Sequence, residues 1–308
     1  MSIVIVDSQL ARENFLKKPF LLKHSLAAHP LFSLARLVEL AKSQPRDAIE
    51  YNSGKVTIGA KPEDVPKLDM PIEAVINSIE KANAWMVIKF VEKDPAYHAL
   101  LENFVREANA AAGRKPSDYS DLQGFIFVSS ANATTPFHVD WEENILIQIK
   151  GDKFVRTFDN ADHALVSEEA LEISPSKHRN QIYAEDHESR ATLYALKPGD
   201  AVHMPYTIPH WVSTGNSYSI SMAMTWKTPE VLRLNKIRFM NGTLRRFGLA
   251  QRPPGASPTM DAAKVLLHDA VRAILDPIRK SETARRVLRG LIYGKKANYY
   301  LETKKTGM

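Results

Sequence analysis

The feature that most constrains the fold is the long stretch from Gln123 to Trp226, in which short apolar and β-branched runs alternate with tight turns. We expect strands at residues 124–128, 144–149, 154–158, 192–196, 201–204 and 217–226. The connections at 150–152 and 197–200 contain glycine, and the second also places proline beside glycine, as reverse turns favour. Short strands joined by tight turns predict an antiparallel barrel or a double-sheet jelly roll.

Helical patterns flank these strands on both sides. Apolar residues recur at helical spacing before Pro45, after Pro95, and after Asp69, which we expect to cap a helix with Pro71 in its first turn. A further strand is expected at residues 85–90. Beyond Trp226 the pattern predicts helices again, with an apolar stripe and then a last helix capped by Ser281; the stripe comprises Leu267, Val271, Ile274 and Ile278. The predicted class is α+β, a jelly-roll core with N-terminal and C-terminal helices.

This pattern divides the chain into three parts. Residues 1–120 form an N-terminal region of helices and strands that packs on the barrel, and residues 121–228 form the jelly-roll catalytic core. Residues 229–308 form basic C-terminal helices. The core contains a long polar insertion at 159–190, which we interpret as a lid or substrate loop because structureless connections of this length are usually functional.

Cysteine usage and hydropathy exclude several classes of protein. The chain of 308 residues contains no cysteine, so disulfide scaffolds, thiolate metal sites and cysteine nucleophiles are excluded. This fits a reducing compartment, and we expect a cytoplasmic protein. No apolar run approaches the roughly 20 residues that span a bilayer, and the apolar patch at residues 3–6 is too short for a secretory signal. We therefore expect no association with a membrane.

The net charge of +6 conceals an asymmetry. Residues 227–308 carry 18 Lys and Arg against 6 Asp and Glu, a net charge of +12, so residues 1–226 carry 23 against 29, a net charge of −6. A basic tail could bind nucleic acid, a membrane surface or an acidic partner. We favour a solvated helical face that balances the acidic body, because the tail has no helix-turn-helix or zinc-finger signature. Nucleic acid is therefore not an expected partner.

Three polar residues on the predicted barrel form a metal-binding pattern. His138 and Asp140 are two residues apart on a predicted strand, so their side chains should point to the same face. His210 follows another strand and would complete a set of two imidazoles and one carboxylate. This set leaves three coordination positions open, as in the non-haem Fe(II) oxygenases. His138 alone would more often be a structural histidine, so the interpretation depends on its context.

Lys153 supplies part of that context. It follows the turn at 150–152, and if it faces into the barrel, its desolvated charge requires an anion. A dicarboxylate co-substrate would provide one, and the hydroxyl of Thr135 could donate to the same carboxylate. The alternative is an ordinary surface lysine on a hairpin.

Together these segments resemble a known family. The run Thr135–Asp140, then Asn144, Gln148–Lys153, Pro198–Asp200 and Pro205–Trp211 resembles the JmjC and cupin-like Fe(II)/2-oxoglutarate oxygenases, especially the factor-inhibiting-HIF-type hydroxylases and bacterial cupin-like proteins. The resemblance implies a cupin fold and covers residues 123–226.

The same resemblance implies residue roles. His138, Asp140 and His210 would be the iron ligands, and Lys153 and Thr135 would bind the distal carboxylate of 2-oxoglutarate. Asn144 would lie near the co-substrate, and Phe127 would form a wall of the pocket. The sequence departs from the family near the end of the last barrel strand, where Met224 or Thr225 replaces an expected asparagine.

The expected function is therefore an Fe(II)- and 2-oxoglutarate-dependent dioxygenase. It would use dioxygen to hydroxylate an unidentified protein side chain or small molecule, and would release succinate and CO2. The alternatives are a metal-binding cupin with different chemistry and a regulator that binds nucleic acid through the basic tail. The C-terminal apolar stripes, and the pairing of such helices in the resembled family, suggest a homodimer.

Overall fold

A computed structural model describes residues 2–60, 65–66, 68, 70–172, 180–278, 281, 283–284 and 287. The chain forms two compact units. The first comprises residues 1–166 and 179–231, and the second comprises residues 167–178 and 232–308. The predicted boundaries at residues 120 and 228 remain predictions. Among the described helices, none combines the length and the apolar character that a bilayer crossing requires.

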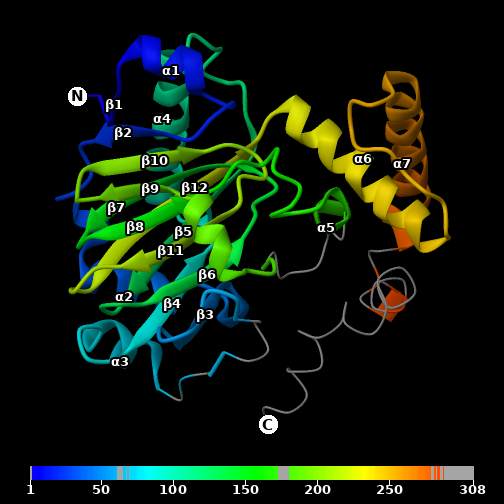
Figure 1. Ribbon diagram of the computed structural model, residues 1–308. Helices are drawn as coiled ribbons and strands as arrows, with labels where there is room; N and C mark the ends of the chain where they lie inside the picture. Colours follow the sequence, from blue (N-terminus) through cyan, green and yellow to red (C-terminus); the bar gives the residue numbers. More distant parts are fainter. Residues whose placement is uncertain are drawn as a thin grey trace. The chain divides into compact units, whose positions relative to one another are not determined.

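Two antiparallel sheets form the first unit (Figure 1). The larger sheet has the order β1-β2-β10-β7-β12-β5-β4-β3, and the smaller has the order β6-β11-β8-β9. The strands are β1 (Val4–Ile5), β2 (Phe20–His24), β3 (Ile49–Ser53), β4 (Ala84–Lys89), β5 (Ser120–Ser129), β6 (Thr134–His138), β7 (Glu143–Lys150), β8 (Lys153–Thr157), β9 (Thr192–Leu196), β10 (Asp200–Met204), β11 (His210–Thr214) and β12 (Ser219–Lys227). This arrangement confirms the predicted α+β jelly roll.

The turn at Gly151 does not close a hairpin. The strands on either side of it belong to different sheets, because β7 pairs with β10 and β12 while β8 pairs with β9 and β11. Gly151 has φ +71°, and a Cβ there would lie 2.3 Å from the carbonyl oxygen of Tyr218, so only glycine fits this corner. The connection therefore carries the chain from the large sheet to the small one and brings Lys153 onto the facing wall of the barrel.

Four helices belong to the first part of the chain: α1 (Ser8–Asn14), α2 (Leu34–Ser43), α3 (Ile72–Asn77) and α4 (Pro95–Ala111). Short 3-10 turns occur at Pro30–Phe32, Arg46–Ala48 and Val91–Lys93, and another occurs at Glu185–Arg190. Helix α3 begins at Ile72 with Pro71 as its cap, so Pro71 does not lie in the first turn as predicted. The predicted cap, Asp69, is outside the described residues. The inward residues predicted for α4, including Tyr97 and Phe104, are fully buried.

Two separate cores result from the alternation of side chains along the strands. One face of the large sheet, with residues such as Ile126 and Met222, joins residues from α2, α3 and α4 in the larger core. The opposite face points into the barrel, where Leu146, Val202 and Ala223 meet Val155 and Val212 of the small sheet. Phe125 and Phe127 are partly exposed at the edge of this inner core. The barrel interior is thus largely apolar, so a polar group buried inside it requires a partner or a functional reason.

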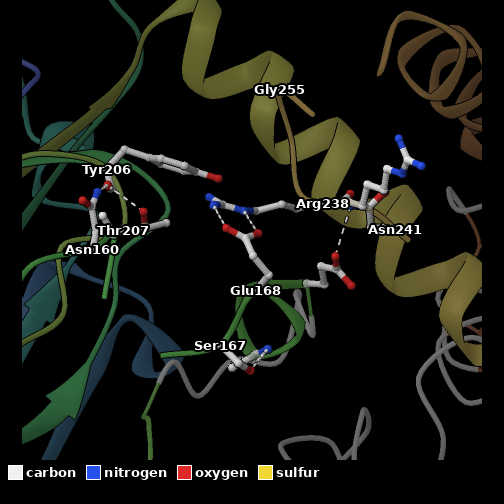
Figure 2. A network of polar contacts seen from close by, with 12 residues as sticks. Asn160, Ser167, Glu168, Tyr206, Thr207, Arg238, Asn241 and Gly255 are labelled. Carbon is white, nitrogen blue, oxygen red and sulfur yellow. Dashed lines mark hydrogen bonds and ion pairs between the residues drawn. The ribbon is translucent and has the colours of Figure 1, made fainter. Parts of the chain in front are cut away.

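The second unit contains α5 (Glu168–Glu172), α6 (Pro229–Arg246), whose first residues belong to the first unit, and α7 (Pro258–Ile278). Its cations pair with acids of the same unit: Arg238 with Glu168 at 3.1 Å (Figure 2), Arg245 with Glu172 at 2.5 Å, and Lys236 with Asp269 at 2.8 Å. These pairs neutralise some of the cations of the second unit locally, and the interpretation of the basic tail remains a prediction.

The predicted apolar stripe on α7 is largely exposed. Leu267 is 46% exposed and Ile274 is 69% exposed, and the neighbouring Leu266 is 71% exposed. The stripe therefore covers little core within the described residues of its unit. The side chain of Ile278, and most of the last helix predicted after Ser281, lie outside the described residues.

Candidate metal centre

Three side chains converge at one end of the barrel. The ligand atoms of His138, Asp140 and His210 all lie within 4.8 Å of one another. His138 ends β6 and pairs directly with His210, the first residue of β11, so their rings are 4.1 Å apart. His210 follows strand β10, as the sequence predicted, and it also begins β11. The register between two neighbouring strands therefore brings together the two histidines, which are far apart in the sequence.

Asp140 reaches the cluster in a different way from the one that the sequence suggested. Strand β6 ends at His138, so Asp140 lies in the following loop and not on the same strand face. Its carboxylate accepts a hydrogen bond of 2.8 Å from Nδ2 of Asn144, and its carbonyl accepts one of 2.9 Å from the backbone N–H of Thr207. These two contacts fix the carboxylate, and its Oδ2 lies 3.9 Å from Nε2 of His210.

Both imidazoles are oriented by backbone carbonyls. Nδ1 of His138 lies 2.7 Å from the carbonyl oxygen of Pro136, and Nδ1 of His210 lies 2.9 Å from that of Ile208. A carbonyl can only accept, so Nδ1 carries the proton and the lone pair of Nε2 is available to a metal. Burial, reinforced by the nearby His138, lowers the pKa of His210 to about 4. His210 is therefore in the neutral form that binds metals.

The loop before His210 is strained. Thr207 has φ +60°, a left-handed conformation that is rare for a β-branched residue. Its neighbour Tyr206 is held from two sides, because its N–H donates to Oε2 of Glu143 at 3.2 Å and its carbonyl accepts from Asn160 at 3.1 Å (Figure 2). Strain of this kind persists where surrounding contacts over-determine the backbone, as they do between these two ligand segments.

The donor set fits a divalent transition metal. Two imidazole nitrogens and one carboxylate oxygen, all on one side, leave positions open for further ligands. Asn144 contacts the carboxylate of Asp140, and its own Oδ1 has no protein partner within the described residues. Thr225, which pairs with Asn144 across β7 and β12, likewise has a buried Oγ1 without such a partner. Thr225 therefore stands beside the metal cluster, where the resemblance implied an asparagine.

Lys153 is buried inside the barrel at 4% exposure. Its Nζ contacts Oγ of Ser221 and lies 5.6 Å from the ring centre of Phe127. No carboxylate lies within ion-pairing distance of it among the residues that the structure describes, and burial lowers its pKa to about 7. The structure thus places Lys153 and Phe127 together, and Lys153 is not the surface lysine of the alternative interpretation.

Thr135 belongs to the same neighbourhood through Trp85. The indole N–H of Trp85 donates to Oγ1 of Thr135 at 3.0 Å, and the Trp85 ring lies 5.7 Å from that of Phe127. Sequence reasoning missed Trp85 and Ser221. Trp85 lies on β4 opposite Ser129, and Ser221 lies on β12 opposite Phe127. Only the register of the strands shows that both residues are near the predicted site.

The last part of the insertion packs outside the barrel. Asn180 pairs with the backbone of His138, and Tyr183 and His187 contact the ring of Phe137. Tyr183 also lies against Phe158 and Trp211, so this segment covers one face of the small sheet. The lid or substrate loop expected over 159–190 remains a prediction, and residues 173–179 lie outside the described residues.

Comparison with known proteins places the chain in a family. Among solved structures it is similar to Escherichia coli YcfD, with a TM-score of 0.49 and 16% identity over 94% of this chain and 72% of that one. It is also similar to the ribosomal oxygenase YcfD in complex with cobalt and 2-oxoglutarate, with a TM-score of 0.49 and 16% identity over 92% and 69% of the two chains. No curated protein matches the sequence. The sequence model of the cupin-like domain family matches residues 25–230, which is more than half of the chain. The protein therefore belongs to the cupin-like domain family.

Proposed function

We propose that the protein is an Fe(II)- and 2-oxoglutarate-dependent dioxygenase that hydroxylates a protein side chain or a small molecule and releases succinate and CO2. One combination of features carries the proposal. A cluster of two histidines and an aspartate shares a barrel with a buried lysine that has no carboxylate partner among the described residues. A metal alone would not require the lysine, whereas a metal-bound dicarboxylate would require both.

In this proposal, Nε2 of His138, Nε2 of His210 and the carboxylate of Asp140 hold the iron. The iron supplies the redox chemistry that couples decarboxylation of the co-substrate to oxidation of a C–H bond. Asn144 holds the Asp140 carboxylate in place through its side-chain amide. The apolar inner core excludes water from the space between the sheets, which strengthens every charge interaction there.

The distal carboxylate of 2-oxoglutarate would meet hydrogen-bond donors. Lys153 donates to Oγ of Ser221, and Trp85 donates to Oγ1 of Thr135, so each hydroxyl retains its own hydrogen for a further acceptor. With the Lys153 ammonium, this gives an anion site that contains no competing carboxylate among the described residues. Phe127 lies beneath the lysine and forms a wall of the pocket.

A metal-binding cupin with different chemistry is the alternative, and calorimetry of Mn(II)-loaded protein separates the two. We expect Lys153→Ala to abolish detectable binding of 2-oxoglutarate, because the charge that neutralises the distal carboxylate is gone. The matched control is Lys150→Ala, which removes an exposed lysine that lies over the Tyr218 ring at the same corner and should not change the affinity. Equal 2-oxoglutarate affinity in the wild type and Lys153→Ala would favour the alternative.

We also infer that the protein forms a homodimer through its C-terminal helices. The support is the apolar side of α7, on which Leu266, Leu267 and Ile274 are exposed. Exposed residues of this size in one helix are typical of an interaction surface, and a two-fold pair would cover both copies at once.

A further inference from the structure

Trp85 was not among the predicted site residues, but it contacts two of them, Thr135 and Phe127. It is on β4, where its neighbours Ala84 and Met86 point into the larger core, so by alternation its side chain faces the inside of the barrel. Its ring is partly exposed and lies 5.7 Å from Phe127. Trp85 contacts Thr135 and Phe127, and Lys153 rests on Phe127, so a role for Trp85 must act through these neighbours.

The hydrogen bond to Thr135 has a fixed polarity. The indole N–H can only donate, so Oγ1 of Thr135 must accept at 3.0 Å. Among the residues that the structure describes, the hydroxyl has no acceptor for its own hydrogen. A threonine hydroxyl rotates freely when nothing restrains it, but here Trp85 occupies one lone pair and directs the hydrogen away from the indole. The hydroxyl is thereby prepared to donate before any ligand arrives.

Trp85 also supports the second donor. Its ring packs on Phe127, and the Phe127 ring lies 5.6 Å from Nζ of Lys153. One indole therefore restrains both the hydroxyl and the aromatic surface against which the ammonium rests. Ordering donors in advance reduces the entropy that a ligand must overcome when it binds.

We propose that Trp85 is a positioning residue for the co-substrate, which orients the Thr135 hydroxyl toward the distal carboxylate of 2-oxoglutarate through its indole N–H. This inference rests on the proposed function. It assigns to Trp85 no contact with the metal and no part in the oxidation itself. The consequence is specific: loss of the N–H should weaken only ligands that carry the distal carboxylate.

The test compares two 2-oxo acids on Mn(II)-loaded protein by calorimetry. Trp85→Phe removes the N–H and keeps an aromatic ring against Phe127. We expect the Kd of 2-oxoglutarate to rise about three- to tenfold, the range for one lost hydrogen bond. The Kd of 2-oxopentanoate, which has the same chain length without the distal carboxylate, should not change. In turnover assays the KM for 2-oxoglutarate should rise by the same factor while kcat is retained.

Two further variants separate positioning from packing. Added to Thr135→Val, Trp85→Phe should cause no further loss of affinity, because the hydroxyl it orients is absent. The matched control is Trp226→Phe: the Trp226 ring is fully buried and its Nε1 has no partner among the described residues, so this change should lower the Tm and leave both Kd values unchanged. If Trp85→Phe does not fold, benzothienylalanine at position 85 removes the N–H while retaining the bicyclic ring.

The outcomes are distinguishable. Equal weakening of both 2-oxo acids, additive losses with Thr135→Val, or an unchanged Kd for 2-oxoglutarate would each overturn the role of Trp85 while leaving the proposed function intact. Failure of the wild-type protein to bind 2-oxoglutarate would refute the proposed function and this inference together.

Discussion

Lys153→Met should make the metal-free protein more stable while it removes co-substrate binding. The wild-type ammonium is buried at 4% exposure, and burial lowers its pKa from 10.5 to about 7. At pH 7 the folded protein therefore keeps the lysine in a state that costs about 4 kcal/mol relative to the unfolded chain, where the group is fully charged and solvated. Methionine has similar length and carries no such cost.

Part of this gain is offset. Ser221 loses the donor that now contacts its Oγ, which costs about 1 kcal/mol. The expected net increase in the free energy of unfolding is therefore about 3 kcal/mol at pH 7. A single substitution that stabilises a domain by this amount is unusual, and it would indicate that Lys153 is retained for ligand binding and not for folding.

The pH dependence gives the prediction its sign. Between pH 7 and pH 10.5 the unfolded chain binds a proton at Lys153 that the folded chain does not, so the wild-type protein becomes more stable as pH rises through this window. The advantage of Lys153→Met should accordingly shrink from about 3 kcal/mol at pH 7 toward zero near pH 9.5. Urea denaturation of both proteins at the two pH values measures this difference, and other titrating groups cancel in it. A variant less stable than the wild type at pH 7, or a difference that does not depend on pH, would refute the reasoning.

Four further outcomes are expected. The affinity of the wild-type protein for 2-oxoglutarate should fall up to about tenfold per pH unit above pH 7, since the bound anion requires protonated Lys153; calorimetry in two buffers should detect proton uptake, and a pH-independent Kd would contradict this. Asp140→Ala should abolish succinate formation without a change in the Tm of the metal-free protein, and full turnover would exclude it as a ligand. Burial lowers the pKa of His203 to about 3, so stability should fall by up to about 1.4 kcal/mol per pH unit as pH drops below 6.5; His203→Phe should reduce this slope in acid denaturation, and an unchanged slope would contradict it. Ile274→Glu should yield monomers in sedimentation of the full chain, and a wild-type monomer would rule out the dimer.

Local patterns were sufficient to predict most elements of the barrel and the three residues of the metal cluster. Strand period and turn chemistry are encoded in neighbouring residues, so β7, β9 and β10 agree with the expected ranges closely, whereas β5 is longer than the strand expected at 124–128. The cluster was predictable because histidine and aspartate at short spacing indicate a specific chemistry. The way in which Asp140 reaches the cluster was not predictable, because its position depends on the backbone of Thr207, distant in sequence.

Other features depend on pairing between strands and could not be predicted from one sequence. The turn at Gly151 has the composition of a hairpin, yet it crosses between sheets, because each strand finds its partners elsewhere in the chain. Trp85 has no signal in its own segment, which is an ordinary buried strand. Its hydrogen bond to Thr135 joins β4 of the larger sheet to β6 of the smaller sheet, a relation that appears only once both sheets are formed.

The corner at Gly151 has a consequence for the proposed choice of co-substrate. The second residue of strand β7, Asn144, contacts Asp140 of the His-Asp-His cluster, and after the strand ends at Lys150 the chain turns at Gly151 directly to Lys153. The tight corner therefore fixes the backbone from which Lys153 extends, and the contact with Ser221 holds its ammonium. Under the proposed function, a pocket built in this way would select dicarboxylates by length: oxaloacetate, one carbon shorter than 2-oxoglutarate, would chelate the metal or reach the lysine, but not both.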